Sequence, residues 1–137
     1  MRVVLDTNVL FASASKTSRH HIIFDSFLEG QYTLLLSNDI LTEYEEIITA
    51  KAGSPLSNKI MELLLNSPNV ELHSIFYKWN LIDRDKDDNK FADLYIAANG
   101  DYLVTNDTHF NEVKMLRFPP INVVTLEEFK ILLTKTK

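Results

Sequence analysis

The stretch RVVLDTN, at residues 2–8, is a short apolar run that ends abruptly in an acid. Runs of this kind, rich in β-branched or large apolar residues and bounded by polar ones, are typical of strands buried inside a sheet. Further stretches of the same character occur at residues 32–36, 70–75, 102–105 and 121–124. The sequence therefore predicts a sheet of about five strands.

Apolar residues at helical spacing fill most of the stretches between these runs. An alternation of strands and helices is typical of a parallel sheet with helices packed on its faces. We predict an α/β fold with three layers, α/β/α, around a central and mostly parallel sheet. Helices are expected at residues 18–30, directly after Ser37, at residues 54–67, at residues 87–99 and from Thr125 onward.

Composition narrows the class of protein further. The chain has 137 residues, of which 45% are hydrophobic and 24% are charged, and its formal net charge is -5. These proportions predict one compact domain over residues 1–137 and exclude a disordered chain. Cysteine is absent, which excludes disulfides, thiolate metal sites and a cysteine nucleophile. No apolar run approaches the roughly 20 residues of a membrane span, so we expect a cytoplasmic protein without a membrane segment.

Two acids follow predicted strands. Asp6 ends the first apolar run, and Asp107 comes shortly after the run at residues 102–105. In open parallel sheets, ligands gather at the carboxyl ends of the strands, so both carboxylates would share one crevice if their strands are neighbours. The alternative interpretation is that each acid caps a helix or forms a local turn.

Two predicted helices carry further acids. Asp88 lies at the start of the helix expected at residues 87–99, and Asp93 lies within its apolar stretch. A carboxylate inside a buried helix must find a cation or a metal, or stay protonated. On the helix after Ser37, Glu43 and Glu45 lie at the two edges of the apolar stripe, and helical geometry does not decide between them.

Four pieces of sequence together resemble the PIN-domain family. They are LDTNV at residues 5–9, Glu43, DDNKF at residues 87–91 and VTND at residues 104–107. The resemblance covers nearly the whole chain. Within the family, the chain is most similar to small single-domain prokaryotic proteins of the VapC-like group, which are the toxins of toxin–antitoxin pairs.

The resemblance implies an acidic tetrad at the end of the sheet. Its members would be Asp6, Glu43, Asp88 and Asp107, with Asp6, Asp88 and Asp107 as metal ligands. Asp93 fits the third motif of many relatives and is either an alternative to Asp88 or a further acid that supports the others. Asn8 and Thr105 match polar positions that support the first and last acids.

The expected activity is that of a ribonuclease. Clustered carboxylates favour one or two hard ions such as Mg²⁺ or Mn²⁺, which can activate water for attack on a phosphodiester bond. The resemblance implies an endoribonuclease, with a cognate antitoxin and a second copy of the chain as partners. Cations beside the third motif, namely Arg84, Lys86 and Lys90, are candidates for contacts to RNA phosphates.

Two other functions compete with this interpretation. A haloacid-dehalogenase-like phosphatase also begins with an apolar strand that ends in Asp. Its chemistry needs a second Asp two residues later, where this chain has Asn8. The other alternative is a catalytically silent PIN-like module that binds RNA or protein, which the presence of all four acids disfavours.

Overall fold

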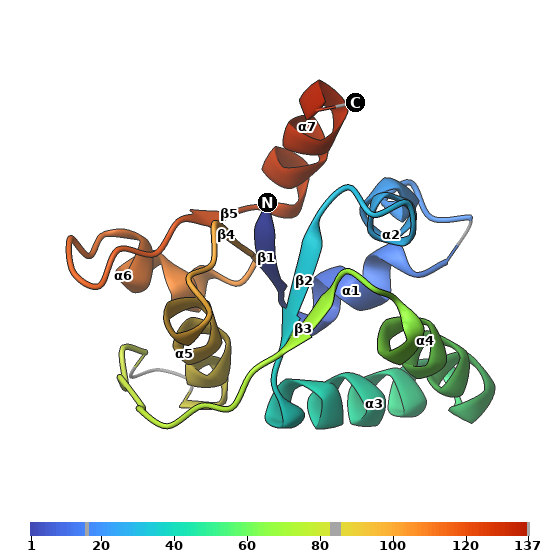
Figure 1. Cartoon of the computed structure of the whole chain (residues 1–137), viewed down its shortest axis with the longest axis horizontal. Coiled ribbons are helices and arrows are strands. Elements are labelled where there is room, and N and C mark those ends of the chain that lie inside the picture. Colours follow the sequence, from blue (N-terminus) through green and yellow to red (C-terminus); the bar gives the residue numbers. More distant parts are fainter. Residues whose placement is uncertain (16, 83–85, 137) are drawn as a thin grey trace.

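A computed structural model describes residues 1–15, 17–82 and 86–136, with Lys86 and Thr136 described through their backbone only. Its core is a sheet of five parallel strands. These are β1 (Arg2–Leu5), β2 (Thr33–Leu36), β3 (Val70–Leu72), β4 (Tyr102–Val104) and β5 (Val123–Val124). They are arranged in the order β3-β2-β1-β4-β5 (Figure 1). The predicted parallel sheet is therefore confirmed.

Strand β1 occupies the centre of this sheet. Val3 pairs with Leu34 of β2 on one side and with Tyr102 of β4 on the other. Both Val3 and Val4 are completely buried, because a central strand in a layered fold is covered on both faces. This burial is the physical reason for the unbroken apolar run that precedes Asp6.

Seven α-helices surround the sheet in the part of the chain that the structure describes. They are α1 (Thr7–Ser13), α2 (His21–Leu28), α3 (Asn38–Ala52), α4 (Ser54–Asn66), α5 (Asn89–Ala97), α6 (Asn111–Lys114) and α7 (Leu126–Thr136). Two short 3₁₀ helices precede α5 and α6, namely η1 (Lys86–Asp88) and η2 (Thr108–Phe110). No helix among the described residues is long and apolar enough to cross a membrane.

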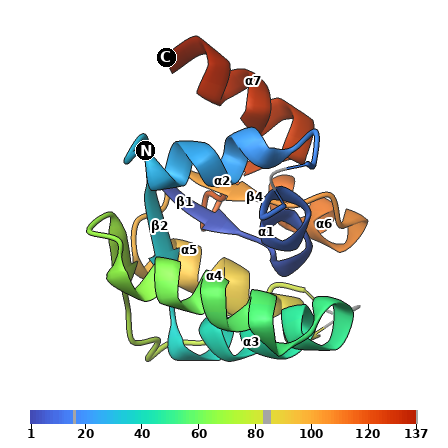
Figure 2. The ribbon, with the colours of Figure 1, turned by 90° about the vertical axis from the view of Figure 1, so that its right-hand side faces the viewer.

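The helices form layers on both sides of the sheet. Helix α5 contacts β1, β2 and β4, whereas α1 and α2 lie on the opposite side (Figure 1). Helices α3 and α4 pack against each other, and α7 lies beside α2 (Figure 2). Tyr32, directly before β2, contacts Phe129 of α7 edge-on, with ring centroids 5.3 Å apart. The three-layer prediction is confirmed.

Several elements differ from the sequence prediction. Helix α1 was not predicted, because its seven residues are too few to establish a helical period. The strand predicted at residues 70–75 ends at Leu72, which is exposed at the edge of the sheet. The strand predicted at residues 121–124 keeps only Val123 and Val124. The segments 73–82 and 115–122 consequently run as irregular chain.

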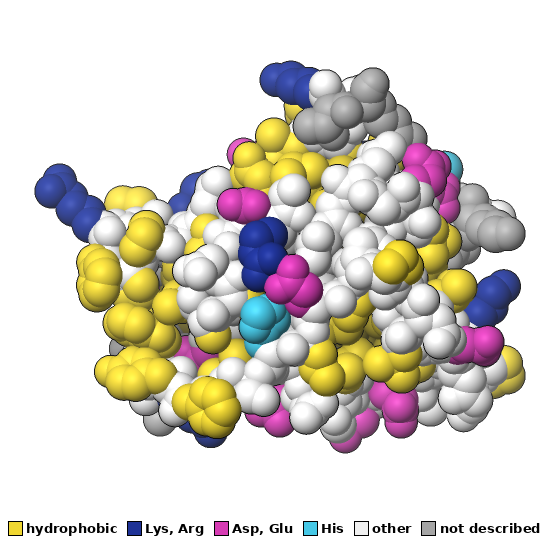
Figure 3. Space-filling model, viewed as in Figure 1, with side chains coloured by type: hydrophobic (Ala, Val, Ile, Leu, Met, Phe, Trp, Pro, Cys, Tyr) yellow, Lys and Arg dark blue, Asp and Glu magenta, His cyan; other side chains and the backbone are white. Residues whose placement is uncertain are grey.

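An aromatic patch joins these two irregular segments. It consists of Tyr77, Trp79 and Phe118, with ring centroids 4.9 Å apart for Tyr77 and Trp79 and 6.0 Å apart for Trp79 and Phe118. Phe76 and Met115 are also strongly exposed. Hydrophobic side chains accordingly gather on the side of the molecule that carries α5 and α6 (Figure 3).

Candidate metal centre

The carboxyl ends of β1 and β4 bring two predicted acids together. These strands are parallel neighbours, and Leu5 pairs with Val104 in their register, so Asp6 and Thr105 follow at the same level. The Thr105 hydroxyl donates a hydrogen bond to Asp6 Oδ2 at 2.8 Å and accepts one from the Asp107 amide at 3.0 Å. One buried hydroxyl therefore links the Asp6 carboxylate to the backbone of Asp107. Thr105 is one of the two polar residues for which the resemblance implies such a contact.

A third acid and a histidine complete this cluster. Asp88 ends η1 directly before α5, and its Oδ2 lies 3.4 Å from Nδ1 of His109. The same Nδ1 lies 3.3 Å from Oδ1 of Asp107. One ligand atom from each of the three residues lies within 4.8 Å of the others, which is compatible with binding to one ion.

Glu43 approaches the same end of the sheet from α3. The Tyr44 hydroxyl fixes this helix to β1, because it donates a hydrogen bond of 2.5 Å to the Leu5 carbonyl. Glu43 then accepts a hydrogen bond from the Thr7 hydroxyl, and its Oε1 lies 2.7 Å from Lys90 Nζ. Glu45 is exposed, so the structure distinguishes the two glutamates that helical geometry left tied.

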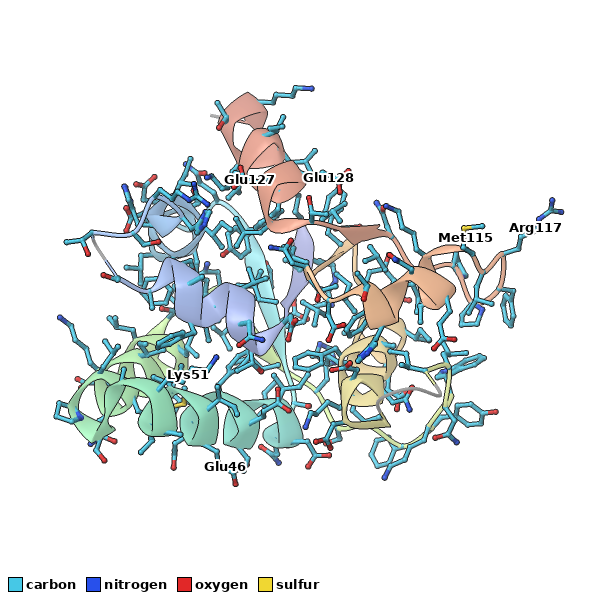
Figure 4. All side chains as sticks on the ribbon, turned by 180° about the vertical axis from the view of Figure 1, so that it is seen from behind. Glu46, Lys51, Met115, Arg117, Glu127 and Glu128 are labelled. Atoms are coloured by element: carbon cyan, nitrogen blue, oxygen red, sulfur yellow. The ribbon has the colours of Figure 1, made fainter. Side chains whose placement is uncertain are left out.

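Glu46, a further acid of this helix, lies outside the cluster. It is exposed and projects away from the body of the protein (Figure 4). Lys51, from the last turn of α3, donates a hydrogen bond of 3.0 Å to Asn8 Oδ1 on α1. Asn8 thus contacts Lys51, and it lines a small cavity together with Asp6 and Asp107.

The electrostatics of Asp6 reflect this environment. Its side chain is buried, with 8% of the residue surface exposed. Burial raises the pKa of Asp6, the Thr105 hydrogen bond opposes that rise, and the charges of Glu43 and Asp107 add to it. Asp6, Glu43 and Asp107 therefore repel one another when all are ionised, a cost that a nearby cation would offset.

Asp93 has a different set of contacts. Its Oδ1 accepts a hydrogen bond of 3.0 Å from the Trp79 amide, which ties α5 to the segment that carries the aromatic patch. Burial raises the pKa of Asp93. Its side chain lines a cavity of about 620 Å³ together with Glu43 and Lys90. Among the described residues, the group with metal-ligand spacing contains Asp88, Asp107 and His109, and neither Asp93 nor the predicted ligand Asp6.

The predicted phosphate contacts are only partly described. Lys90 is bound to Glu43, and that ion pair raises the pKa of Lys90 against the opposing effect of burial. Arg84 and the side chain of Lys86 lie outside the described part of the structure. His109 was not singled out by the sequence, and its only signal is its place two residues after Asp107.

The donor atoms of this site fit a divalent cation. Carboxylate oxygens are the usual ligands of Mg²⁺ and Mn²⁺, and Asp88 and Asp107 offer two of them beside an imidazole nitrogen. The buried Asp6 carboxylate gains from a nearby positive charge, because its ionised form is otherwise poorly solvated. These donor atoms are therefore compatible with a metal centre.

Comparison with known families identifies the domain. A model of the PIN domain matches residues 2–109 of this chain. The chain belongs to the PIN domain family. The membership favours the PIN interpretation over the phosphatase alternative, and Asn8, which stands where a phosphatase needs an acid, agrees with it. Comparison with curated proteins gives no match.

Three solved structures share the fold of this PIN domain. One is a chain of the VapBC2 complex from Rickettsia felis, which was solved with a DNA fragment from the promoter of VapBC2. It has a TM-score of 0.63 at 19% identity, and the match covers 91% of this chain and 98% of that chain. The toxin VapC20 from Mycobacterium tuberculosis, which cleaves the sarcin–ricin loop, has a TM-score of 0.62 at 12% identity, with coverage of 86% and 99%. FitAcB from Neisseria gonorrhoeae has a TM-score of 0.58 at 15% identity, with coverage of 91% and 98%.

Proposed function

We propose that this PIN domain is a metal-dependent endoribonuclease and the toxin of a toxin–antitoxin pair. The observation that carries the proposal is the approach of Asp88, Asp107 and His109 within metal-ligand spacing, with Asp6 joined to the Asp107 backbone through Thr105 and with Glu43 close to Asp6. Family membership supports the same activity. The proposed site of action is the cytoplasm.

In this mechanism, Asp6, Asp88 and Asp107 would hold Mg²⁺ or Mn²⁺, as one or two ions. A bound ion of this type supplies activated water and offsets the negative charge that develops on the phosphate. Thr105 orients the Asp6 carboxylate and the Asp107 backbone. Thr7 and Lys90 hold Glu43 in place at the rim of the site.

Approach of the RNA requires cations, because the pocket itself is acidic. Lys90 lies at the rim with its ammonium on Glu43, where it lowers the negative potential that a phosphate meets. Arg84 and Lys86 are its proposed companions along the same segment. The sarcin–ricin loop is the target of VapC20, which supports a nucleic-acid loop as the type of substrate here.

The activity can be tested with a single-stranded RNA oligonucleotide. Cleavage should need Mg²⁺ or Mn²⁺, stop in EDTA and fall about 100-fold or more in Asp6→Asn, because metal stabilisation of the reaction is worth several kcal/mol. The matched control is Asp25→Asn on the exposed face of α2, where Asp25 pairs with His21. Undiminished cleavage by purified Asp6→Asn protein would contradict the assignment, and binding of RNA without cleavage by the wild type would favour the silent module.

The proposal includes two protein partners, a cognate antitoxin and a second copy of the chain. Support comes from the exposed aromatic patch, because large apolar surfaces often mark protein contacts. Light scattering of the purified chain should give the mass of a dimer. A monomer at all concentrations would contradict the second partner.

A further inference from the structure

His109 is held beside the acidic cluster by its own backbone. It belongs to η2, whose first turn is capped by Asp107, since Asp107 Oδ1 accepts a hydrogen bond of 2.9 Å from the His109 amide. The next residue, Phe110, is completely buried in the core. Cap and anchor together restrict the imidazole ring to the neighbourhood of the carboxylates.

The ring faces two acids from different parts of the chain. Its Nδ1 lies 3.3 Å from Asp107 Oδ1 and 3.4 Å from Asp88 Oδ2. His109 and Asp107 are about equally accessible, with side-chain exposures of 34% and 33%, whereas Asp88 is more enclosed at 13%. The arrangement therefore offers two oxygens and one nitrogen to an ion that enters from solvent.

We propose that His109 is a ligand of the metal and that its nitrogen makes this site prefer Mn²⁺ to Mg²⁺. This inference rests on the proposed metal-dependent function, and it adds a nitrogen donor to the four acids on which that function was built. Mg²⁺ is bound almost entirely by oxygen ligands. Imidazole nitrogen favours first-row transition ions, most strongly Fe, Ni, Cu and Zn and least strongly Mn²⁺. Because Mg²⁺ is bound almost entirely by oxygen, a nitrogen ligand still raises affinity for Mn²⁺ more than affinity for Mg²⁺.

A second histidine–carboxylate pair provides an internal control. His21 Nδ1 lies 2.6 Å from Asp25 Oδ2, one helical turn away on α2, with both side chains close to half exposed. That pair is closer than the contacts of His109, yet it involves a single acid on the surface of one helix. If every histidine–carboxylate pair bound metal, substitution of either His21 or His109 would weaken metal binding. If only the acidic cluster binds metal, substitution of His109 alone would weaken it.

The decisive measurements are calorimetric titration and pulsed electron paramagnetic resonance, which need no RNA. Wild-type protein should bind Mn²⁺ more tightly than Mg²⁺, and its Mn²⁺ complex should show coupling to a directly bound ¹⁴N nucleus. His109→Gln should remove that coupling and weaken Mn²⁺ binding by about tenfold or more, with a smaller change for Mg²⁺. His21→Gln should behave as wild type in both measurements.

His109→Asp keeps the proposal testable if His109→Gln fails to fold. Replacing nitrogen by a carboxylate oxygen should leave metal binding intact and lower the preference for Mn²⁺ over Mg²⁺. A wild-type Mn²⁺ complex without ¹⁴N coupling, or an unchanged preference in His109→Asp, would overturn the role of His109 while leaving the nuclease proposal in place. Failure of the wild type to bind either ion would overturn both.

Discussion

Substitution of Thr105 by Val tests how the candidate metal centre is held together. The two side chains have nearly the same shape, so the change removes a hydroxyl without opening a cavity. The lost hydroxyl donates to the Asp6 carboxylate and accepts from the Asp107 amide. A hydrogen bond to a charged group contributes about 1.5–3 kcal/mol, and an unpaired buried amide costs about 1–3 kcal/mol. The two effects share one site, and the amide is only partly buried. We therefore expect Thr105→Val to lower the free energy of unfolding by about 2–4 kcal/mol in total.

Urea unfolding in EDTA measures this loss directly, with the stability of the metal-free chain as the readout. The matched control is Thr134→Val on exposed α7, where the hydroxyl bonds only to the Lys130 carbonyl at 2.9 Å, and we expect a change below about 0.5 kcal/mol. Thr105→Val should also weaken Mn²⁺ binding by about 10–100-fold, as is usual when a group that supports metal ligands is lost. If both variants lose the same small amount of stability, the linking role of Thr105 is refuted.

Three further predictions concern single side chains. Burial raises the pKa of Asp6, so the contribution of Asp6 to stability is present below its unfolded pKa and is lost as pH rises through its folded pKa. Asp6→Asn should therefore raise the free energy of unfolding of the metal-free chain at about pH 7 and change it little at about pH 3. Urea unfolding at the two pH values measures both effects. Tyr44→Phe removes the 2.5 Å hydrogen bond to the Leu5 carbonyl and should cost about 1–3 kcal/mol in the same assay, whereas an unchanged midpoint would mean that this contact does not hold α3. Asp88→Asn should weaken Mn²⁺ binding, measured by calorimetry, more than Asp93→Asn does. Asp93→Asn should instead change the fluorescence of Trp79. If Asp93→Asn weakens Mn²⁺ binding more than Asp88→Asn, Asp93 is the third acid of the site.

The fold was largely predictable because the strands are buried on both faces. Such strands produce apolar runs that stand out from the helical spacing around them, as β1 does before Asp6. The edges of the sheet were less predictable, since an exposed edge strand such as β3 has no two-sided burial to mark its end at Leu72. Short elements such as α1 and α6 span too few residues for any period to be recognised.

The arrangement of the candidate site was predictable where it follows from topology. Asp6 and Asp107 were expected to lie together because the carboxyl ends of parallel strands meet at one edge of the sheet. Glu43 was preferred to Glu45 only because of the resemblance to a family. His109 could not be found in this way, because it lies in a 3₁₀ turn where neither helical nor strand periodicity applies. Its position depends on the capping bond from Asp107 and on the approach of Asp88 from another part of the chain.

The central place of β1 has a consequence for the synthesis of this protein. Asp6 is synthesised before its hydrogen-bond partner Thr105, which is 99 positions further along the chain. The neighbouring strand β4 and the acid that follows it emerge only after β2, β3 and most helices have been made. A nascent chain therefore cannot form the contact between Asp6 and Thr105 until the segment that follows β4 has been translated, so the candidate site assembles late in synthesis relative to its first acid.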